Sequence, residues 1–203
     1  MAISNYLELK QAIERWAKRG DIASLTDDFI DLAESDIYQN LRVRDMEARA
    51  TATTGSDRFL ALPDGFLEMR KLTLVSGSLR YDLTSVVPES LQLQETSGIP
   101  SSFSVTSQLE FNRIPAGNYT AEMQYYKTLT PLSTTDPVNG ILTRFPTVYL
   151  YGALFHFAQF AHNDAMLQKY LPLFSTAVEL ANKSDRRGRY GPAPAMRIEG
   201  STP

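Results

Sequence analysis

The stretch VYLYGALFHFAQFA, residues 148–161, constrains the fold more than any other part of the sequence. Its residues are apolar nearly all round a helix, but it is shorter than the roughly 20 residues that a helix needs to cross a bilayer. It also contains His156 and Gln159. These features predict a central buried helix, which must be covered on every side by its own domain or by neighbouring subunits. The second alternative is a first indication of an oligomer.

Amphipathic patterns predict two helices near the N-terminus. The first covers residues 7–19 and ends at Gly20, and the second begins after Ser24. The apolar stripe of the first consists of Leu9, Ala12, Ile13 and Trp16, and that of the second of Phe29, Ile30, Ala33, Ile37 and Leu41. Carboxylates in or near the first turn of the second helix, which suit the positive end of the helix dipole, are Asp27, Asp28 and Asp31. We interpret these acids as a helix start with a solvated face, not as a catalytic pair.

The last predicted helix begins at about Asn163 or Asp164 and is kinked at Pro172. Its apolar face consists of Leu167, Leu171, Phe174, Val178 and Ala181. Between the helices, residues 58–127 are rich in Thr, Ser, Val, Phe and Tyr and carry several turn signals, which predicts an antiparallel β-meander. Within it we expect a hairpin over residues 109–125 that turns at PAGN, and a short helix over residues 87–95. The pattern therefore predicts an α+β fold in which helices flank a β insertion.

Composition excludes several classes of protein. The 203 residues carry a net charge of −3 and a pI near 5.4, so there is no basic field of the kind that drives non-specific binding to nucleic acid. The absence of cysteine excludes disulfides and thiolate chemistry, and it agrees with folding in a reducing cytoplasm. MAISNYLELKQ reaches charged residues before any apolar run develops, so we expect no signal peptide and a chain that is made and used inside a cell.

No catalytic or cofactor motif stands out. His156 and His162 are six residues apart, whereas a pair of metal ligands on one helix needs a spacing of about four, so we expect no metal and no cofactor. Patterns for a serine nucleophile elbow, a P-loop and a dinucleotide fold are missing. Glycoside hydrolysis needs only two carboxylates, which any of the 23 acidic residues could supply, so this weak motif carries almost no evidence.

The segment LRVRDMEARAT, residues 41–51, is the most informative candidate site. It lies at the end of the second predicted helix and interleaves both signs of charge at Arg42, Arg44, Asp45, Glu47 and Arg49. A solvated helix end explains such a pattern equally well, since exposed ion pairs contribute little. The alternative is a contact between neighbouring subunits, where a patch of both signs meets a complementary patch on the next copy.

LRVRDMEARAT, followed by RFLALPDGFLEMRKLTL and later by TRFPTVYLYGALFHFAQF, resembles the adaptor proteins of tailed bacteriophages. The resemblance runs from about Tyr6 to Arg189 and lies in order and spacing, not in a short signature. It implies a mainly helical bundle with an inserted β region, assembled as a ring of about twelve copies beneath the portal protein. It further implies a virion protein at the head-tail junction that continues the DNA channel and provides a surface for tail attachment, with genomic DNA passing through without sequence-specific binding.

On this interpretation the chain divides into residues 1–56, the first helices; 57–130, the β-rich insertion; 131–187, a loop and the last helices; and 188–203, an extended arm. Large side chains are scarce in the arm, and Gly188, Gly191 and Pro192 stop a helix from continuing. A frayed terminus is the plain interpretation. The resemblance implies instead that residues 186–203, the end of the last helix together with the arm, dock on the portal through Arg186, Arg187, Arg189, Tyr190, Met196, Arg197 and Ile198.

Two other functions stay open. Some proteins that resemble phage adaptors degrade cell wall, but no residue pair here matches a motif for that activity. A small nucleic-acid-binding module would use Arg186, Arg187, Arg189 and Tyr190, where basic and aromatic groups are interleaved. The adaptor function, without catalysis, without a membrane and with portal, tail proteins and further copies of the chain as partners, is the one we expect.

Overall fold

The computed structural model describes residues 3–190, without the side chain of Tyr190. The described residues form two compact units, one made of residues 3–45 and 130–190 and the other of residues 46–129. We call them the helical unit and the β unit. An α+β fold was predicted, and the structure confirms it. The helices are α1 (Tyr6–Ala17), α2 (Thr26–Asn40), α3 (Gly140–Arg144), α4 (Pro146–Phe160) and α5 (Asp164–Tyr190), with short 3-10 helices η1 (Arg44–Met46) and η2 (Pro88–Ser90).

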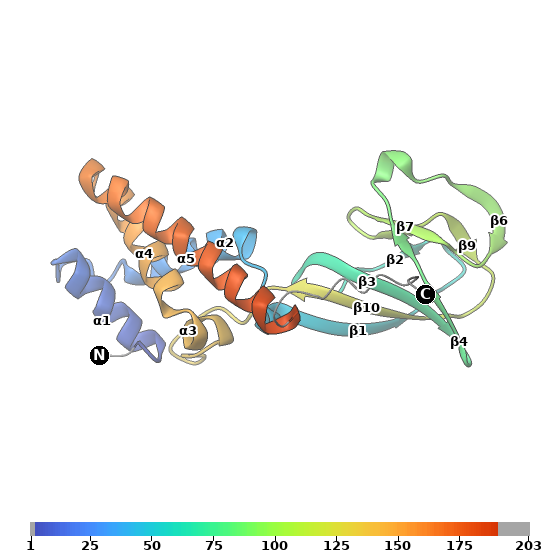
Figure 1. Cartoon of the computed structure of the whole chain (residues 1–203), viewed down its shortest axis with the longest axis horizontal. Coiled ribbons are helices and arrows are strands. Elements are labelled where there is room, and N and C mark those ends of the chain that lie inside the picture. The colour runs from blue at the N-terminus through green and yellow to red at the C-terminus, as the bar shows by residue number, and fades with distance from the viewer. Residues whose placement is uncertain (1–2, 191–203) are drawn as a thin grey trace, which may run out of the picture. The chain divides into compact units, whose positions relative to one another are not determined.

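In the helical unit, α4 is the central element and contacts the other four helices (Figure 1). Its predicted burial is largely confirmed, because α1, α2 and α5 of its own chain cover most of it. Thr147 and Gln159 are exposed, however, and Phe160, at the last position of α4, is about half exposed. A buried Gly152 allows this close packing, since a Cβ there would lie 3.0 Å from the Ala33 Cβ on α2 and 3.1 Å from Phe174 on α5. The cover is thus intramolecular, and α4 alone does not require an oligomer.

The helix starts and stops follow local signals. Asn5 caps α1 by accepting a hydrogen bond from the Glu8 amide, and Lys18 in the left-handed region ends it, two residues before the predicted stop at Gly20. The start of α5 at Asp164 was predicted, and the helix continues through Pro172 to Tyr190. The predicted arm is therefore wrong at its beginning, because residues 188–190 are helical. Its remaining residues, 191–203, lie outside the described part of the chain.

Two apolar side chains point differently from the prediction. Trp16 is 46% exposed and meets Tyr151 of α4 only at its ring, with 6.0 Å between the ring centroids, while Ala17 takes the buried position. Leu171 is 44% exposed, and Tyr170 instead is buried with Phe174. In each helix the neighbouring residue is buried in place of the predicted one. A helix advances 100° per residue, so a residue at the edge of the apolar stripe can be exposed while its neighbour in the sequence faces the core.

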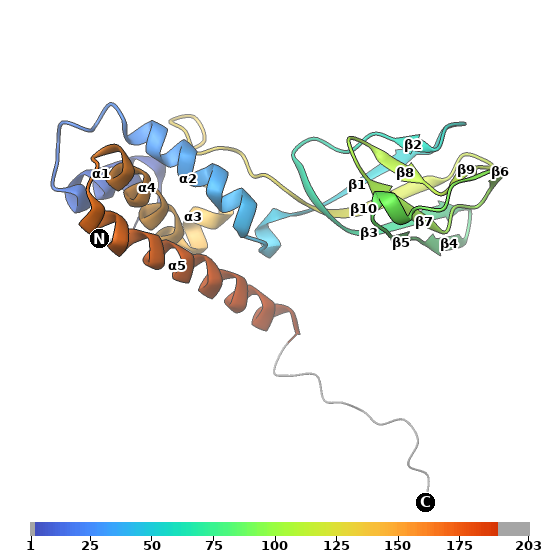
Figure 2. The same ribbon diagram turned by 90° about the horizontal axis from the view of Figure 1, so that it is seen from above.

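The strands of the β unit are β1 (Glu47–Thr53), β2 (Phe59–Leu60), β3 (Phe66–Ser76), β4 (Leu79–Asp82), β5 (Thr84–Ser85), β6 (Gln94–Gly98), β7 (Ser102–Val105), β8 (Leu109–Phe111), β9 (Arg113–Pro115) and β10 (Thr120–Lys127). They form a sheet of order β1-β10-β3-β4, a second of order β2-β8-β7-β5 and a pair β6-β9 (Figure 2). The core of the unit includes Leu72, Leu74, Phe103, Phe111 and Met123.

The β unit corrects three predictions. The hairpin over residues 109–125 is wrong, because β8 pairs with β2 and β7 whereas β10 pairs with β1 and β3. A simple meander is wrong too, since β5/β7 and β6/β9 are parallel, although the other pairs are antiparallel as expected. The short helix at 87–95 is reduced to the 3-10 turn η2. Long-range pairing decided each case, and no local turn signal specifies it.

Candidate assembly sites

The end of α5 in the helical unit carries a cluster of arginines around one buried carboxylate, and we call this set of Asp185, Arg44, Arg144 and Arg189 the Asp185 cluster. The side chain of Asp185 is only 1% exposed. Its Oδ2 accepts hydrogen bonds from Arg189 Nε at 2.7 Å and from the Arg44 backbone amide at 3.2 Å, and its Oδ1 accepts from Arg44 Nε at 3.0 Å. Arg144 Nη2 completes the cluster at 3.5 Å from Oδ1. One carboxylate thus connects three parts of the helical unit.

The arginines have further partners that fix their orientation. Arg144, which ends α3, also forms an ion pair with Asp45 at 2.7 Å between Nη1 and Oδ2. Two glycines allow these side chains to approach. A Cβ on Gly188 would lie 3.1 Å from Nη2 of Arg44, and a Cβ on Gly140 would lie 2.8 Å from the Asp45 Cβ. Gly188 therefore serves close packing inside α5, where the sequence suggested that it would end the helix.

Electrostatics at Asp185 favour the ionised form. Burial by itself would raise the pKa of this carboxyl, but hydrogen bonds from Arg189 and Arg44 outweigh burial and hold its pKa below the usual range. The three guanidinium groups around Asp185 and Asp45 leave the cluster with an excess positive charge. Arg186 and Arg187, which are exposed on the same turn of α5, add to it. The end of α5 therefore presents a basic surface that the Asp185 cluster holds in place.

The structure divides the interleaved charges of residues 42–49 between the two units. In the helical unit the Arg42 amide donates to Asn182 Oδ1 at 2.8 Å, while Arg44 and Asp45 belong to the network just described. Glu47 and Arg49 lie on β1 of the β unit. The prediction of a helix end was wrong here, because the segment passes through η1 directly into a strand.

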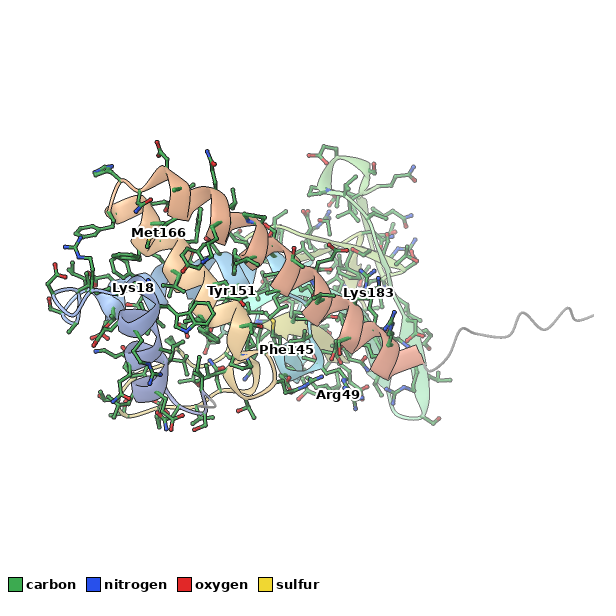
Figure 3. All side chains as sticks on the ribbon, turned by 60° about the vertical axis from the view of Figure 1, so that its left-hand side comes forward. Lys18, Arg49, Phe145, Tyr151, Met166 and Lys183 are labelled. Atoms are coloured by element: carbon green, nitrogen blue, oxygen red, sulfur yellow. The ribbon has the colours of Figure 1, made fainter. Side chains whose placement is uncertain are left out.

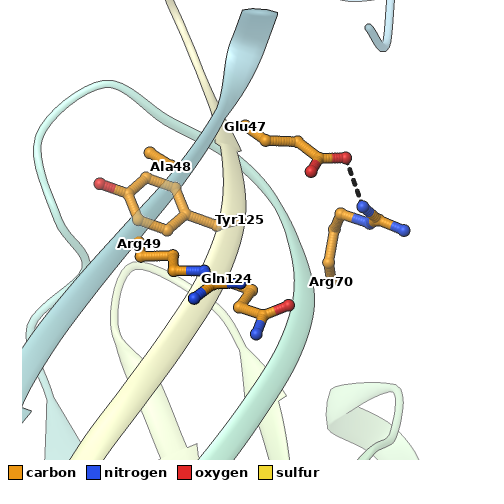
Figure 4. A pocket seen from close by; sticks show the side chains of 6 residues that line it. All are labelled: Glu47, Ala48, Arg49, Arg70, Gln124 and Tyr125. Atoms are coloured by element: carbon orange, nitrogen blue, oxygen red, sulfur yellow. Dashed lines mark hydrogen bonds and ion pairs between the residues drawn. The ribbon is translucent and has the colours of Figure 1, made fainter. Parts of the chain in front are cut away.

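In the β unit, Glu47 pairs with Arg70 of β3 beside a pocket of about 250 Å³ that Arg49, Gln124 and Tyr125 also line (Figure 4). The Arg70 guanidinium also lies 5.5 Å from the centre of the Tyr126 ring. This shallow pocket contains no nucleophile or paired acids. Its groups serve to hold β1 against the sheet.

The predicted portal-contact residues lie in different environments or outside the described residues. Arg186 and Arg187 are exposed on α5, but Arg189 is directed into the Asp185 cluster and its side chain is only 13% exposed. Arg189 therefore supports the fold of the helical unit, whereas the sequence predicted that it lies in an extended arm. Tyr190 ends α5, and Met196, Arg197 and Ile198 lie outside the described residues.

An apolar groove of about 460 Å³ runs between α4 and α5. Figure 3 shows Phe145 and Tyr151 on one side of α5 and Lys183 on the other. Leu173 and Leu180 line the groove from α5, and Leu180 is 59% exposed. Such a furrow between two packed helices, with an exposed leucine at its edge, is a surface that a further helix can cover.

A second buried carboxylate, Glu34 on α2, holds the loop of residues 130–139 that precedes α3. Its Oε1 accepts from the Leu132 amide at 2.9 Å and from the Tyr149 hydroxyl at 3.0 Å, and Asn139 donates to that hydroxyl at 2.7 Å. Burial raises the pKa of Glu34, although the Leu132 and Tyr149 hydrogen bonds act in the opposite direction. Glu34 is only 4% exposed and both of its donors belong to its own chain, so we assign this network a structural role.

Sequence reasoning missed Asp185, Arg144 and Glu34. The spacing of Asp185 and Arg189, four residues apart on one helix, is a local signal that could have indicated their pairing. Nothing local could indicate Arg44 or Arg144, which lie 141 and 41 positions from Asp185.

Chemical sites are sparse in residues 3–190. Within them, no group of three or more His, Cys, Asp or Glu is placed to hold a metal ion. His156 instead contacts Asp36, with 2.9 Å between Nε2 and Oδ2, and His162 has a left-handed backbone at the turn after α4. None of the helices in this range is long and apolar enough to cross a membrane.

The described residues form an α+β protein with candidate contact surfaces and no recognised catalytic constellation. Comparison with known families identifies the class. Residues 4–197 match the family described as SU10 adaptor protein, so the chain belongs to this family of phage head-to-tail adaptors, and the resemblance drawn from the sequence is confirmed. No curated protein matches the chain.

Proposed function

We propose that this protein forms a ring of about twelve copies beneath the portal of a tailed phage, at the head-tail junction of the virion. The ring extends the DNA channel, helps to retain packaged DNA and provides the surface to which the tail attaches. The family match over residues 4–197 carries the proposal. The net charge of −3 agrees with it, because a strongly basic channel wall would hold DNA phosphates back.

The end of α5 docks on the portal. Arg186 and Arg187 are exposed there for charged contacts, and Arg189 holds the helix end through Asp185. From the resemblance, Tyr190, Met196, Arg197 and Ile198 continue the contact beyond the helix. A rigid basic helix end followed by a docking segment places charge and apolar anchors in a fixed order along one line.

The subunit contact predicted at residues 42–49 stays a prediction. In the structure, Arg44, Asp45 and Glu47 are paired with groups of their own chain. A neighbouring copy would therefore meet a network that is already neutralised in part, and the added stability from charge would be small. A stronger subunit contact must come from another surface.

Electron microscopy of the full chain mixed with the portal protein of the same phage tests the function. We expect rings of added density under the portal, and portals without added density would overturn the proposal.

A chain truncated after Tyr190 keeps the Asp185 cluster intact, which truncation after Arg187 would not. It should fold normally but dock weakly. Arg186→Glu should weaken docking of the full chain, whereas Lys169→Glu near the other end of α5 is the matched control.

The adaptor function also predicts that the protein does not hydrolyse peptidoglycan. A clearing assay with the full chain checks this. Hydrolysis that disappears when one carboxylate is replaced by its amide would show an enzymatic function.

A further inference from the structure

The outward face of α2 is acidic and has one large apolar side chain. Leu32 is 50% exposed, and Asp28, Asp31 and Ser35 around it are exposed as well. The opposite face of α2, with Phe29 and Ala33, packs on α4. The outward face is therefore uncovered within the described chain, and its centre is an exposed leucine.

The acidic residues at the start of α2 repel one another. Desolvation raises the pKa of Asp31, and the charges of Asp27 and Asp28 raise it further. Lys10 of α1 forms an ion pair with Asp27 at 2.5 Å, with the Tyr6 hydroxyl as a second donor to it. A basic partner placed against Asp28 and Asp31 would relieve the remaining repulsion.

The groove between α4 and α5 has the complementary character. Its exposed leucine is Leu180, its floor includes Tyr151, and small side chains of α5 such as Ala177 and Ser184 leave room for another helix. Arg187 follows Leu180 by two helical turns on the same side of α5 and is exposed. The groove is thus an apolar furrow with a basic end.

The chain's own α2 does not occupy this groove. It contacts α4 at Gly152, His156 and Phe157, whereas α4 lines the groove with Thr147 and Tyr151. Figure 2 shows α2 along one edge of the helical unit and α5 along the other. An acidic face and a basic groove on separate parts of one unit are the two halves of a heterologous contact, which generates a ring when the rotation closes.

We propose that α2 of one copy lies antiparallel in the α4/α5 groove of the next copy, with Leu32 against Leu180 and Asp28 directed toward Arg187. The occupant is a second copy of this chain, and charge complementarity together with the antiparallel helix dipoles selects it. The proposal rests on the proposed ring function and names the surface that forms the ring.

The register is consistent with helix geometry. Asp28 precedes Leu32 by about 6 Å along α2, and Arg187 follows Leu180 by about 10 Å along α5. In an antiparallel pair both offsets point the same way, which leaves about 4 Å for the long arginine side chain to bridge. Parallel packing would instead place the acidic start of α2 away from the basic end of α5.

Cross-linking tests the contact directly, because the chain has no cysteine of its own. A full chain carrying both Leu32→Cys and Leu180→Cys is assembled on the portal and oxidised. A disulfide needs Cα atoms within about 7 Å, so the pair reports close packing. We expect a ladder of dimers, trimers and larger products on a non-reducing gel. Bands that stop at dimers would indicate a self-complementary contact, and monomers alone would show that the helices do not meet; either result overturns the proposal.

The controls use matched residues. Leu32→Cys alone and Leu180→Cys alone should give monomers, and so should Leu32→Cys combined with Leu171→Cys, since Leu171 is exposed on α5 outside the groove. A ladder of equal strength from this last pair would contradict the assigned surface.

Charge reversal tests the orientation in the same double-cysteine background. Asp28→Lys and Arg187→Glu should each lower the ladder yield about two- to fivefold in the portal-bound fraction, as expected for an exposed pair, and the two together should restore it. Glu179→Lys, on the other side of α5, is the control. If the combined variant falls below both single variants, the antiparallel pairing is wrong.

Failure of the α2 contact can be distinguished from failure of the adaptor function. Micrographs of the same samples show whether the chain binds the portal at all. Portal-bound rings without a ladder overturn the α2 surface and leave the adaptor function standing. Portals without bound chain overturn the adaptor function, and with it this contact.

Discussion

The helical unit and the β unit use charge in opposite ways. In the helical unit one buried carboxylate, Asp185, gathers three arginines from distant parts of the sequence. In the β unit the ion pairs are separate and join one acid to one base, as in Glu47 with Arg70 or Glu122 with Arg80. Replacement of Asp185 would remove all of its ion pairs at once, whereas a replacement in the β unit would remove a single pair.

This difference suggests a division of labour. A shared buried charge fixes the relative positions of α3, the start of η1 and the end of α5, so it suits a surface that must be rigid before it docks. Exposed pairs across a sheet add little to stability and tolerate change. We therefore expect the assembly contacts to depend on the helical unit, and the following variants test the contrast in order of expected effect.

Removal of the central charge should have the largest effect. Asp185→Asn leaves the three arginines without their shared carboxylate and should lower the free energy of unfolding by about 1.5–3 kcal/mol. Denaturant unfolding of the full chain measures the loss. Asp164→Asn, at the exposed start of the same helix, should change it far less, and an equal loss in both variants would contradict the special role of Asp185.

Acid should remove the same contribution. The folded-state pKa of Asp185 is lowered, so its stabilisation is present above the unfolded value of about 3.9 and is lost as pH falls through the folded pKa. The difference in unfolding free energy between the wild type and Asp185→Asn should therefore be constant near pH 6 and shrink below about pH 4. A difference that grows in acid would refute the assignment.

Glu34 should show the opposite sign. Its folded-state pKa is raised, so the wild type gains stability as pH falls through that pKa toward the unfolded value of about 4.3. Glu34→Gln keeps an acceptor oxygen for Leu132 and Tyr149 but cannot titrate. The stability of the wild type relative to this variant should rise as the pH falls from neutrality toward the unfolded value of about 4.3. A difference in unfolding free energy that stays constant over this fall would show that the charge of Glu34 does not destabilise the fold.

The pairs of the β unit should have the smallest effects. A double-mutant cycle with Glu47→Gln and Arg70→Met should give a coupling energy of about 0.2–1 kcal/mol, and one with Glu122→Gln and Arg80→Met should give no more. Thermal unfolding of the four proteins in each cycle supplies the values. Coupling of about 2 kcal/mol in either cycle would remove the contrast between the units.

The sequence predicted the helical unit better than the β unit because helix signals are local. The apolar run of α4, the acids that begin α2 and the start of α5 can each be recognised within a few residues. Glu47–Thr53 alternates between exposed and half-buried positions, but its inward residues are alanines, which make a weak period-two pattern. The pairing of β10 with β1 and β3 depends on contacts far apart in the chain, so turn signals around it predicted the wrong partner.

The candidate sites show the same limit. The exposed arginines of α5 could be identified from the sequence. The Asp185 cluster beneath them could not, because Arg44 and Arg144 reach Asp185 only through the tertiary fold. Likewise, the apolar period placed Phe174 on the buried face of α5 and left Leu180 off it, but it did not indicate that Leu180 lines an open groove.

Hydrogen exchange of the full chain, free and bound to the portal, tests the central claim that the helical unit carries the assembly contacts. The account predicts new protection in α2 and in the second half of α5, with the strands β1, β3 and β10 nearly unchanged. Protection confined to the strands of the β unit, with α2 and α5 exchanging as in the free protein, would contradict it.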